Sequence, residues 1–449
     1  MTIVTRARDF EAPVPLAQAA KPAAPDLTYQ TKHSRYGYGC DVRATYAHLP
    51  CQPVWTWLTG KALPKGPPRS PAETLLTEPQ LWCQIAWSWS IVIVCVALAS
   101  VVYNSDSTQL PLKLPVFVLC WLLVVNRTRG LLHTFHYTNH GASIANMARA
   151  RWMAKYFMSV PILHTAWDNY HSIHAKDHHS WKNLCTDKDP DQQFMTQHGF
   201  RSGMSETEYW LRVVFAPFFP INIWKHFKFR LEQNFIVTSW QEVVPRVIFW
   251  VTLFAAAVAL NLLPELALFY LLPLFIFTQH SSWIQHVTEH LWFHQRPADV
   301  SPFVWSGSLT WGRFFGRPHP GRGHGLRHAA RLLRWWLLVL FADLPVRLYS
   351  FMQDLSSHDF HHRSPRVNFW SITRERAAHE GRPSKFGPMT ETWSVRESLL
   401  VLRDCLCRGE KDPFGLYAWD RAMHAKPAAV PVNSISGRGA ECARKPLKR

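Results

Sequence analysis

The chain has 449 residues, of which 47% are hydrophobic, and it is rich in Trp (22) and Phe (27), whose rings favour the headgroup level of membranes. This composition argues against a water-soluble enzyme. The formal net charge of +18 does not indicate nucleic acid, because the basic residues lie beside apolar runs, where anionic lipid and the excess of positive charge in cytoplasmic segments explain them.

The N-terminal region, residues 1–78, is polar, rich in Pro and mixed in charge. It lacks the continuous apolar core of a signal peptide, so we expect the first spanning helix to direct the chain to the membrane. The region is predicted to be cytoplasmic and partly disordered.

Two apolar runs follow, and we predict that they span the bilayer at about 82–103 and 112–132. The first lies in a stretch without charge from 79 to 105, and its length matches the roughly 20 residues that a spanning helix needs. The second is shorter, so Lys113 at one end and Arg127 and Arg129 at the other must reach toward the headgroups.

A second pair of apolar runs, at about 245–263 and 265–286, is separated by a turn at Pro264 and Glu265. Two hairpins return both termini and both long polar regions to one side, which the excess of basic residues indicates is the cytoplasm. We therefore predict an all-α, multi-pass integral membrane protein with four transmembrane helices in two hairpins. A cytosolic helical cap is expected within the membrane domain, residues 79–372.

Two further stretches are amphipathic. Tyr209 to Arg230 mixes aromatic and basic residues, which predicts a helix lying in the membrane interface. Leu332 to Tyr349 is similar but interrupted by charges, and the sequence leaves open whether it crosses the membrane or lies on it. Residues 373–449 are predicted to form a cytoplasmic C-terminal tail that is flexible beyond about 380.

Histidines cluster at the ends of the predicted spans in four groups. The groups are His136 and His140; His174, His178 and His179; His290, with His286 before it; and His358, His361 and His362. Residues three or four apart are neighbours on a helix, so each group can point several imidazoles in one direction. The four-span topology also brings all four groups to the same side of the membrane.

Nine of these histidines are candidate metal ligands, with His286 as a contested tenth. Imidazole suits Zn, Cu, Fe and Ni, so the ligand type does not name the metal. Nine ligands are too many for one tetrahedral zinc but suit two metals with four or five ligands each. Two redox metals in a dry site suggest oxygen chemistry. A hydrocarbon C–H bond has no proton that a side-chain base could remove, so attack on a lipid chain needs a strong metal-based oxidant.

Three of the groups resemble the histidine boxes of the integral-membrane fatty acid desaturases and their relatives, the alkane monooxygenases and lipid hydroxylases. They are His136 to His140 (HYTNH), His174 to His179 (HAKDHH) and His358 to His362 (HDFHH), and the resemblance covers roughly residues 80–370. It implies that the histidines hold two Fe ions, that O2 is a co-substrate, and that His290, preceded by Glu289, supplies a further ligand.

The resemblance leaves several neighbouring residues open. His286 stands where relatives have Asn, and it could bind metal directly, through water, or not at all. His133 and His171 share helix faces with the boxes and are expected to act beside the ligands rather than as ligands. Acidic residues that could orient the imidazoles, or simply be solvated, are Asp168, Asp177, Asp187 and Glu289.

The expected function is O2-dependent desaturation of a fatty acyl chain in a lipid or acyl substrate. A hydroxylase of fatty acids or alkanes, or an oxidative decarboxylase, would use the same di-iron centre, and box spacing does not distinguish these products. A hypothesis from another class is a non-catalytic membrane protein that binds or transports metal.

Such an enzyme needs electrons, and the chain shows no carrier of its own. We therefore expect an external, ferredoxin-like donor. The basic stretch 296–334, with seven Arg against one Asp, could dock this donor through Arg313, Arg317 or Arg322, or could equally hold an acyl-carrier phosphate or lipid headgroups.

Overall fold

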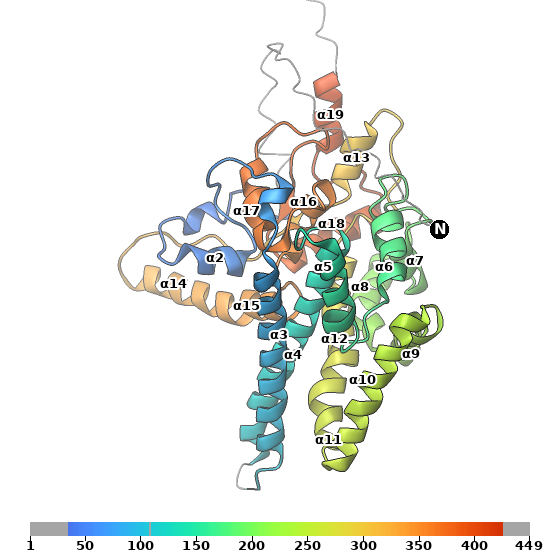
Figure 1. Ribbon diagram of the computed structural model, residues 1–449. Coiled ribbons are helices and arrows are strands. Elements are labelled where there is room, and N and C mark those ends of the chain that lie inside the picture. The colour runs from blue at the N-terminus through green and yellow to red at the C-terminus, as the bar shows by residue number, and fades with distance from the viewer. Residues whose placement is uncertain (1–34, 107–108, 425–449) are drawn as a thin grey trace, which may run out of the picture.

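The computed structural model describes residues 35–106 and 109–424 and is mostly helical (Figure 1). Among these residues the strands are β1 (Gly312–Arg313) and β2 (Glu391–Thr392), which pair in parallel. The segments 1–34 and 425–449, which hold much of the expected N-terminal disorder and the end of the expected tail, lie outside the described residues.

Four helical segments are long and apolar enough to cross a membrane, which confirms the number predicted. They are α3 (Glu78–Tyr103), α4 (Leu110–Asn139), α10 (Trp240–Ala259) and the segment Leu263–Val287. The last consists of α11 (Leu263–Leu266), two π-helical turns, η7 (Ala267–Leu271) and η8 (Pro273–Phe277), and α12 (Thr278–Val287).

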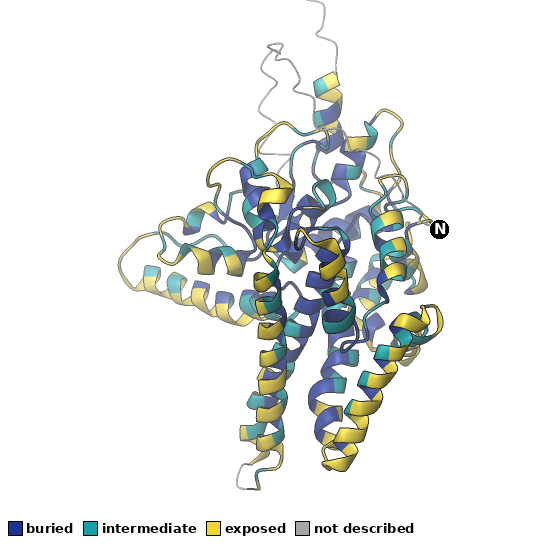
Figure 2. Ribbon diagram, viewed as in Figure 1, coloured by how far each residue is buried: buried dark blue, intermediate teal, exposed yellow. Residues whose placement is uncertain are grey.

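Local chemistry explains where these helices begin and how they pack. Thr77 caps α3, since its hydroxyl accepts the Gln80 backbone N–H while the Gln80 side chain accepts the Thr77 N–H. Leu81 of α3 and Phe117 of α4 lie in one buried apolar cluster. Figure 2 shows exposed residues along the outer sides of α3 and α10, and many of these are apolar, as expected of surfaces that face lipid.

The second span extends further than expected, since α4 continues past 132 to Asn139. Its last turns carry Arg129, His133 and His136, which are buried against other elements rather than exposed at a membrane surface. The first histidine box therefore lies on the same continuous helix as the span.

A lateral lobe contains α2 (Gln52–Thr59), α14 (Leu326–Leu338), η9 (Val339–Asp343) and α15 (Leu344–Tyr349). Tyr46, Trp55 and Trp335 pack together and join α2 to α14. The helix α14 runs at a wide angle to α3 (Figure 1) and is not among the four crossing-length segments. By length and composition, residues 332–349 are therefore not a fifth candidate span.

The remaining helices and turns include η4 and α16, which carry candidate ligands. The α-helices are α5 (Met147–Met153), α6 (Trp167–Tyr170), α7 (Pro190–Gln197), α8 (Glu206–Phe215), α9 (Pro220–Leu231), α13 (Pro302–Ser308), α16 (His358–Arg363), α17 (Phe369–His379), α18 (Val395–Arg408) and α19 (Leu416–His424). The π-helical turns are η3 (Ala154–Ser159), η4 (His171–His178) and η6 (Glu232–Ile236), and the 3-10 turns are η1 (Ala44–Tyr46), η2 (Pro71–Thr74), η5 (Ala216–Phe218) and η10 (Leu355–Ser357).

The region after 380 is not a flexible tail as far as residue 424, which corrects the expectation. Val401 and Leu402 of α18 are fully buried in the largest apolar cluster, and the Tyr209 hydroxyl donates to the Leu399 carbonyl at 2.7 Å. Leu399, Leu402 and Leu406 recur at helical spacing, so α18 can bury one apolar face although its other face is charged.

Candidate metal centre

The nine candidate ligands come together in two separate sets. The five-histidine set is His136, His140, His174, His179 and His361, and the four-histidine set is His178, His290, His358 and His362. Within each set, one side-chain nitrogen per residue lies within 4.8 Å of the corresponding nitrogen of every other member. Each set is therefore a group that could hold a metal ion.

The second box contributes to both sets because its backbone is π-helical. The His179 N–H donates to the His174 carbonyl, five residues back, at 3.0 Å. This wider turn places His174 with His179 and directs His178 to the other set. The pairing of His174 with His178 expected from the sequence also occurs, in a smaller group with Asp191 whose ligand atoms all lie within 4.8 Å of one another.

The other boxes follow ordinary helical spacing. His136 in the last turn of α4 and His140 at its C-terminal end are four apart and share the five-histidine set. In α16, His358 and His362 are four apart and share the other set, while His361 faces the first.

Ring nitrogens of the five-histidine set face one another. The Nε2 atom of His361 lies 2.8 Å from Nε2 of His136 and 3.2 Å from Nε2 of His179, which is 3.1 Å from Nε2 of His174. The Nε2 atom of His140 is buried and has no hydrogen-bond partner within the described part of the chain. A neutral imidazole has only one N–H, so these nitrogens cannot all be satisfied by one another, whereas a cation would accept all their lone pairs.

The four-histidine set has the same character. Nε2 of His358 lies 3.0 Å from Nε2 of His362 and 3.3 Å from Nε2 of His290. The two sets adjoin, since the rings of His179 and His362 are stacked with centroids 4.2 Å apart. Both donor sets consist of convergent imidazole nitrogens and fit metal ions.

The protonation state of most of the candidate ligands also suits metal binding. Burial lowers the pKa of His140 to about 3. Burial, reinforced by neighbouring imidazoles, lowers the pKa values of His174, His179 and His361 in the first set. The same causes lower those of His290, His358 and His362 in the second. These imidazoles are neutral near pH 7, which is the form that coordinates a metal.

His178 differs because it lies against carboxylates. Burial alone would lower its pKa, but Asp189 and Asp191 outweigh burial and raise the pKa to about 9. Its Nδ1 donates to Oδ1 of Asp189 at 3.0 Å, and the Cys185 N–H holds the other Asp189 oxygen at 2.8 Å. Near pH 7 His178 is therefore protonated on both ring nitrogens, and a metal would bind Nε2 by displacing its proton while Asp189 holds the proton on Nδ1.

The acids expected to orient the imidazoles are mostly elsewhere. Asp168 is 66% exposed and pairs with Arg151, and Asp187 lies 3.5 Å from Gln192. Among the described residues, the Asp177 carboxylate accepts no hydrogen bond from a candidate ligand, although its backbone carbonyl accepts the His179 N–H. Asp189, which was not assigned this role, lies at the N-terminus of α7, where an acidic cap is favoured.

Glu289 is the expected acid that does reach a ligand. Its Oε1 lies 3.2 Å from Nε2 of His358, accepts a hydrogen bond from Gln285 at 2.9 Å and lies 3.8 Å from Arg313. A carboxylate at this position partly neutralises the positive charge of a bound metal.

His286, the contested tenth position, belongs to neither set. Its Nε2 lies 3.3 Å from the Asp191 carbonyl, and its Nδ1 lies 3.6 Å from Glu289. His133 and His171 are also outside the sets, and Nδ1 of His171 lies 3.0 Å from Oδ1 of Asn139. A residue missed by sequence reasoning is Tyr170, whose hydroxyl lies 3.0 Å from Nδ1 of His136.

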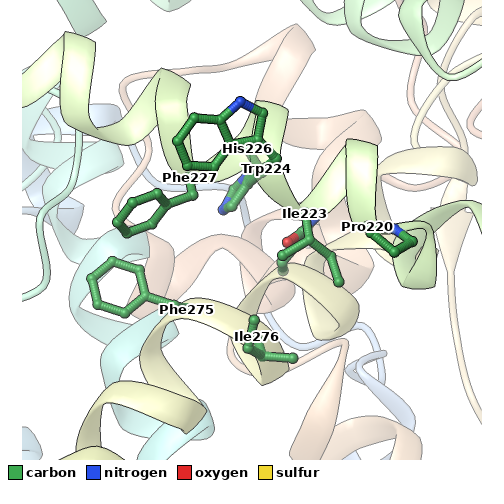
Figure 3. A pocket seen from close by; sticks show the side chains of 8 residues that line it. Pro220, Ile223, Trp224, His226, Phe227, Phe275 and Ile276 are labelled. Carbon is green, nitrogen blue, oxygen red and sulfur yellow. The ribbon is translucent and has the colours of Figure 1, made fainter.

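Two cavities lie along the fourth span. One, of about 210 Å³, is lined by histidines of both sets and by Ser282 and Gln285 of α12. The other, of about 400 Å³, lies between α9 and the helix carrying Phe275, and its lining is apolar apart from His226 and Gln279 (Figure 3). Gln279 and Ser282 are three residues apart on α12, so the cavities adjoin the same side of that helix.

No protein-family model matches the chain, and no curated protein matches it either.

Proposed function

We propose that this protein is a membrane-bound, non-haem di-iron oxidoreductase that uses O2 to desaturate a fatty acyl chain. The observation that carries the proposal is the division of nine buried or half-buried histidines into two adjoining sets of five and four. One metal centre would leave half of these nitrogens without a role, whereas two metals use all of them.

The metals we assign are two Fe ions. Both sets lack Cys, and iron with imidazole ligands is suited to oxygen activation. When bound, the irons would supply the oxidising power that removes hydrogen from an unactivated C–H bond. The chain's own residues hold the ions, keep His178 in one tautomer through Asp189, and exclude water by burying the ligands.

The substrate we assign is a lipid or other acyl chain, and the apolar cavity of Figure 3 supports it. Ile223 and Phe227 of α9 face Phe275 and Ile276 across this cavity. Its position beside α12, which also lines the histidine cavity, suits a chain that approaches the metals from the membrane.

The proposed topology has two transmembrane hairpins, α3 with α4 and α10 with α11 to α12. Both termini and the histidines lie on the cytoplasmic side, where the helices from α13 onward form a cap. In Figure 1, α13 and α16 to α19 lie at the same end of the four long helices, which supports this arrangement. A cytoplasmic, ferredoxin-like protein would supply the electrons.

The test is to express the full chain and measure bound iron by elemental analysis and host lipids by mass spectrometry. We expect iron in the native protein and in the variant His324→Ala, which changes an exposed histidine outside both sets, and its loss in His361→Ala. Lipids with added double bonds should accompany the iron.

Other outcomes would change the assignment in distinct ways. Hydroxylated or shortened chains would favour a hydroxylase or an oxidative decarboxylase with the same centre. Bound iron without any lipid change would favour the non-catalytic metal-binding or transport protein. A native protein without iron would overturn the di-iron proposal.

A further inference from the structure

One face of α14 and η9 is apolar and uncovered. Leu333 is 61% exposed and Phe341 is 76% exposed, and Trp336, Leu337 and Leu340 are also exposed. The opposite face is buried, since Trp335 and Val339 pack in the cluster that contains Tyr46 and Trp55. The helix therefore contacts the protein on one side and presents an apolar surface on the other.

Three arginines lie along one edge of this apolar face. Arg327, Arg331 and Arg334 are spaced by four and three residues, which places them in one row on the helix surface. All three are exposed, and none has an ion-pair partner in the portion of the chain that the structure describes. The row is therefore available to bind anions.

The position of α14 along the axis of the long helices is set by the contact of α15 with α4. The Asn126 side-chain amide of α4 donates to the Leu348 carbonyl of α15 at 2.6 Å. Asn126 immediately precedes Arg127, the first charged residue after the apolar stretch of α4. The lobe thus meets α4 where its apolar part ends, and α14 extends sideways from there (Figure 1).

We propose that α14 lies on the membrane surface, with its apolar face among the upper acyl chains and Arg327, Arg331 and Arg334 on the phosphates of anionic lipids. A planar guanidinium matches phosphate geometry with paired hydrogen bonds. An amphipathic helix of this kind binds through both its apolar area and its attraction to anionic headgroups. The proposal needs only that the long helices cross a membrane, so it stands apart from the di-iron proposal.

The alternative occupant, an acidic electron donor, fits less well. The same basic stretch contains Arg313, which is buried and donates to the carbonyls of Gln285 and Leu355. Arg317 pairs with Asp343 at 2.6 Å. A soluble donor bound to the arginines would leave the apolar face of α14 uncovered, whereas a bilayer would cover that face and bind the arginines at the same time.

The test uses the full chain in nanodiscs of pure phosphatidylcholine or of phosphatidylcholine with phosphatidylglycerol. Amide hydrogen exchange of residues 326–341 should be slower with phosphatidylglycerol, by roughly fivefold per arginine and on the order of 100-fold for the three. The variant Arg327→Gln, Arg331→Gln and Arg334→Gln should remove this difference.

Two further variants make the result specific. The control changes Arg382, Arg396 and Lys411 to Gln, which removes the same charge from exposed positions outside α14, and it should keep the lipid dependence. Changing Leu333, Leu337 and Phe341 to Ser should speed exchange in both lipids.

Equal exchange in the two lipids would overturn the proposal. So would a triple Gln variant that keeps the lipid difference but no longer accepts electrons from a ferredoxin, since α14 would then be a protein-docking surface.

Discussion

The Nε2 atoms of His136 and His361 lie 2.8 Å apart, although 225 positions separate these residues in the chain. The contact joins the end of α4 to α16 and places the first and third histidine boxes in one donor set. The five histidines of this set could together hold a metal ion.

His361→Ala should therefore lower the iron content more than the loss of an isolated histidine would. The variant removes a donor that faces both His136 and His179, so the remaining nitrogens of the five-histidine set no longer enclose the ion. Iron per protein is measured by elemental analysis. Normal iron in His361→Ala, with normal iron also in His324→Ala, would contradict the assignment of His361 as a ligand.

Asp189→Asn should weaken metal binding while preserving size. Asn cannot supply the negative charge that fixes the His178 proton on Nδ1, and loss of such a partner lowers metal affinity by roughly 10- to 100-fold. The matched control is Asp187→Asn, because Asp187 contacts no candidate ligand and should bind metal as the native protein does. Competition with a chelator of known affinity measures both variants, and equal affinities would show that Asp189 does not position His178.

Arg376→Met should destabilise the fold beside the third box. Arg376 pairs with Asp359 at 2.8 Å, both side chains are buried, and removing one partner of such a pair costs roughly 3 to 5 kcal/mol. Arg421→Met removes a pair with Asp299 in which both side chains are more than half exposed, and it should change little. Thermal unfolding in detergent compares them, and similar unfolding midpoints would contradict the prediction.

Stability should depend on pH through Asp343. Burial raises the pKa of this carboxyl to about 6 from an ordinary value of 3.8, despite the opposing effect of Arg317. The folded state thus holds the proton more tightly than the unfolded state. The resulting contribution to the free energy of unfolding is full below about pH 4 and is lost as pH rises through 6.

Between pH 5 and 7 the native protein should therefore lose roughly 1 to 1.5 kcal/mol of stability that Asp343→Asn does not lose. Chemical unfolding at both pH values measures the difference. Parallel pH dependences in the two proteins would show that Asp343 does not titrate in this range.

Ile223→Trp should obstruct the cavity of Figure 3 and lower conversion of the acyl substrate by on the order of 10- to 100-fold, because the chain could no longer reach its reactive position. Iron content should not change, since Ile223 belongs to neither donor set and does not line the histidine cavity. The control Val251→Trp adds the same bulk to an exposed position of α10 and should leave product formation unchanged. Unchanged product lipids in Ile223→Trp would exclude this cavity as the substrate path.

The four crossing-length helices and the candidate ligands were evident in the sequence because both depend on local properties. A run of about 20 apolar residues is long enough to cross a bilayer whatever surrounds it. Likewise, His358 and His362 share a helix face through spacing alone. The described residues of the N- and C-terminal regions were harder to judge, because the burial of Tyr46 and Leu402 depends on partners far away in the chain.

Only the tertiary structure decided how the nine histidines divide. The π-helical turn η4 places His174 with His179 and sends His178 to the other set, and no local pattern distinguishes this turn from an α-helix. The structure likewise selected Asp189 rather than Asp187 as the partner of His178, and placed α14 to one side of α3 (Figure 1). These features depend on packing between segments that are distant in the chain. Residue spacing therefore predicted which histidines are candidate ligands, but only the folded chain shows how they divide into two sets.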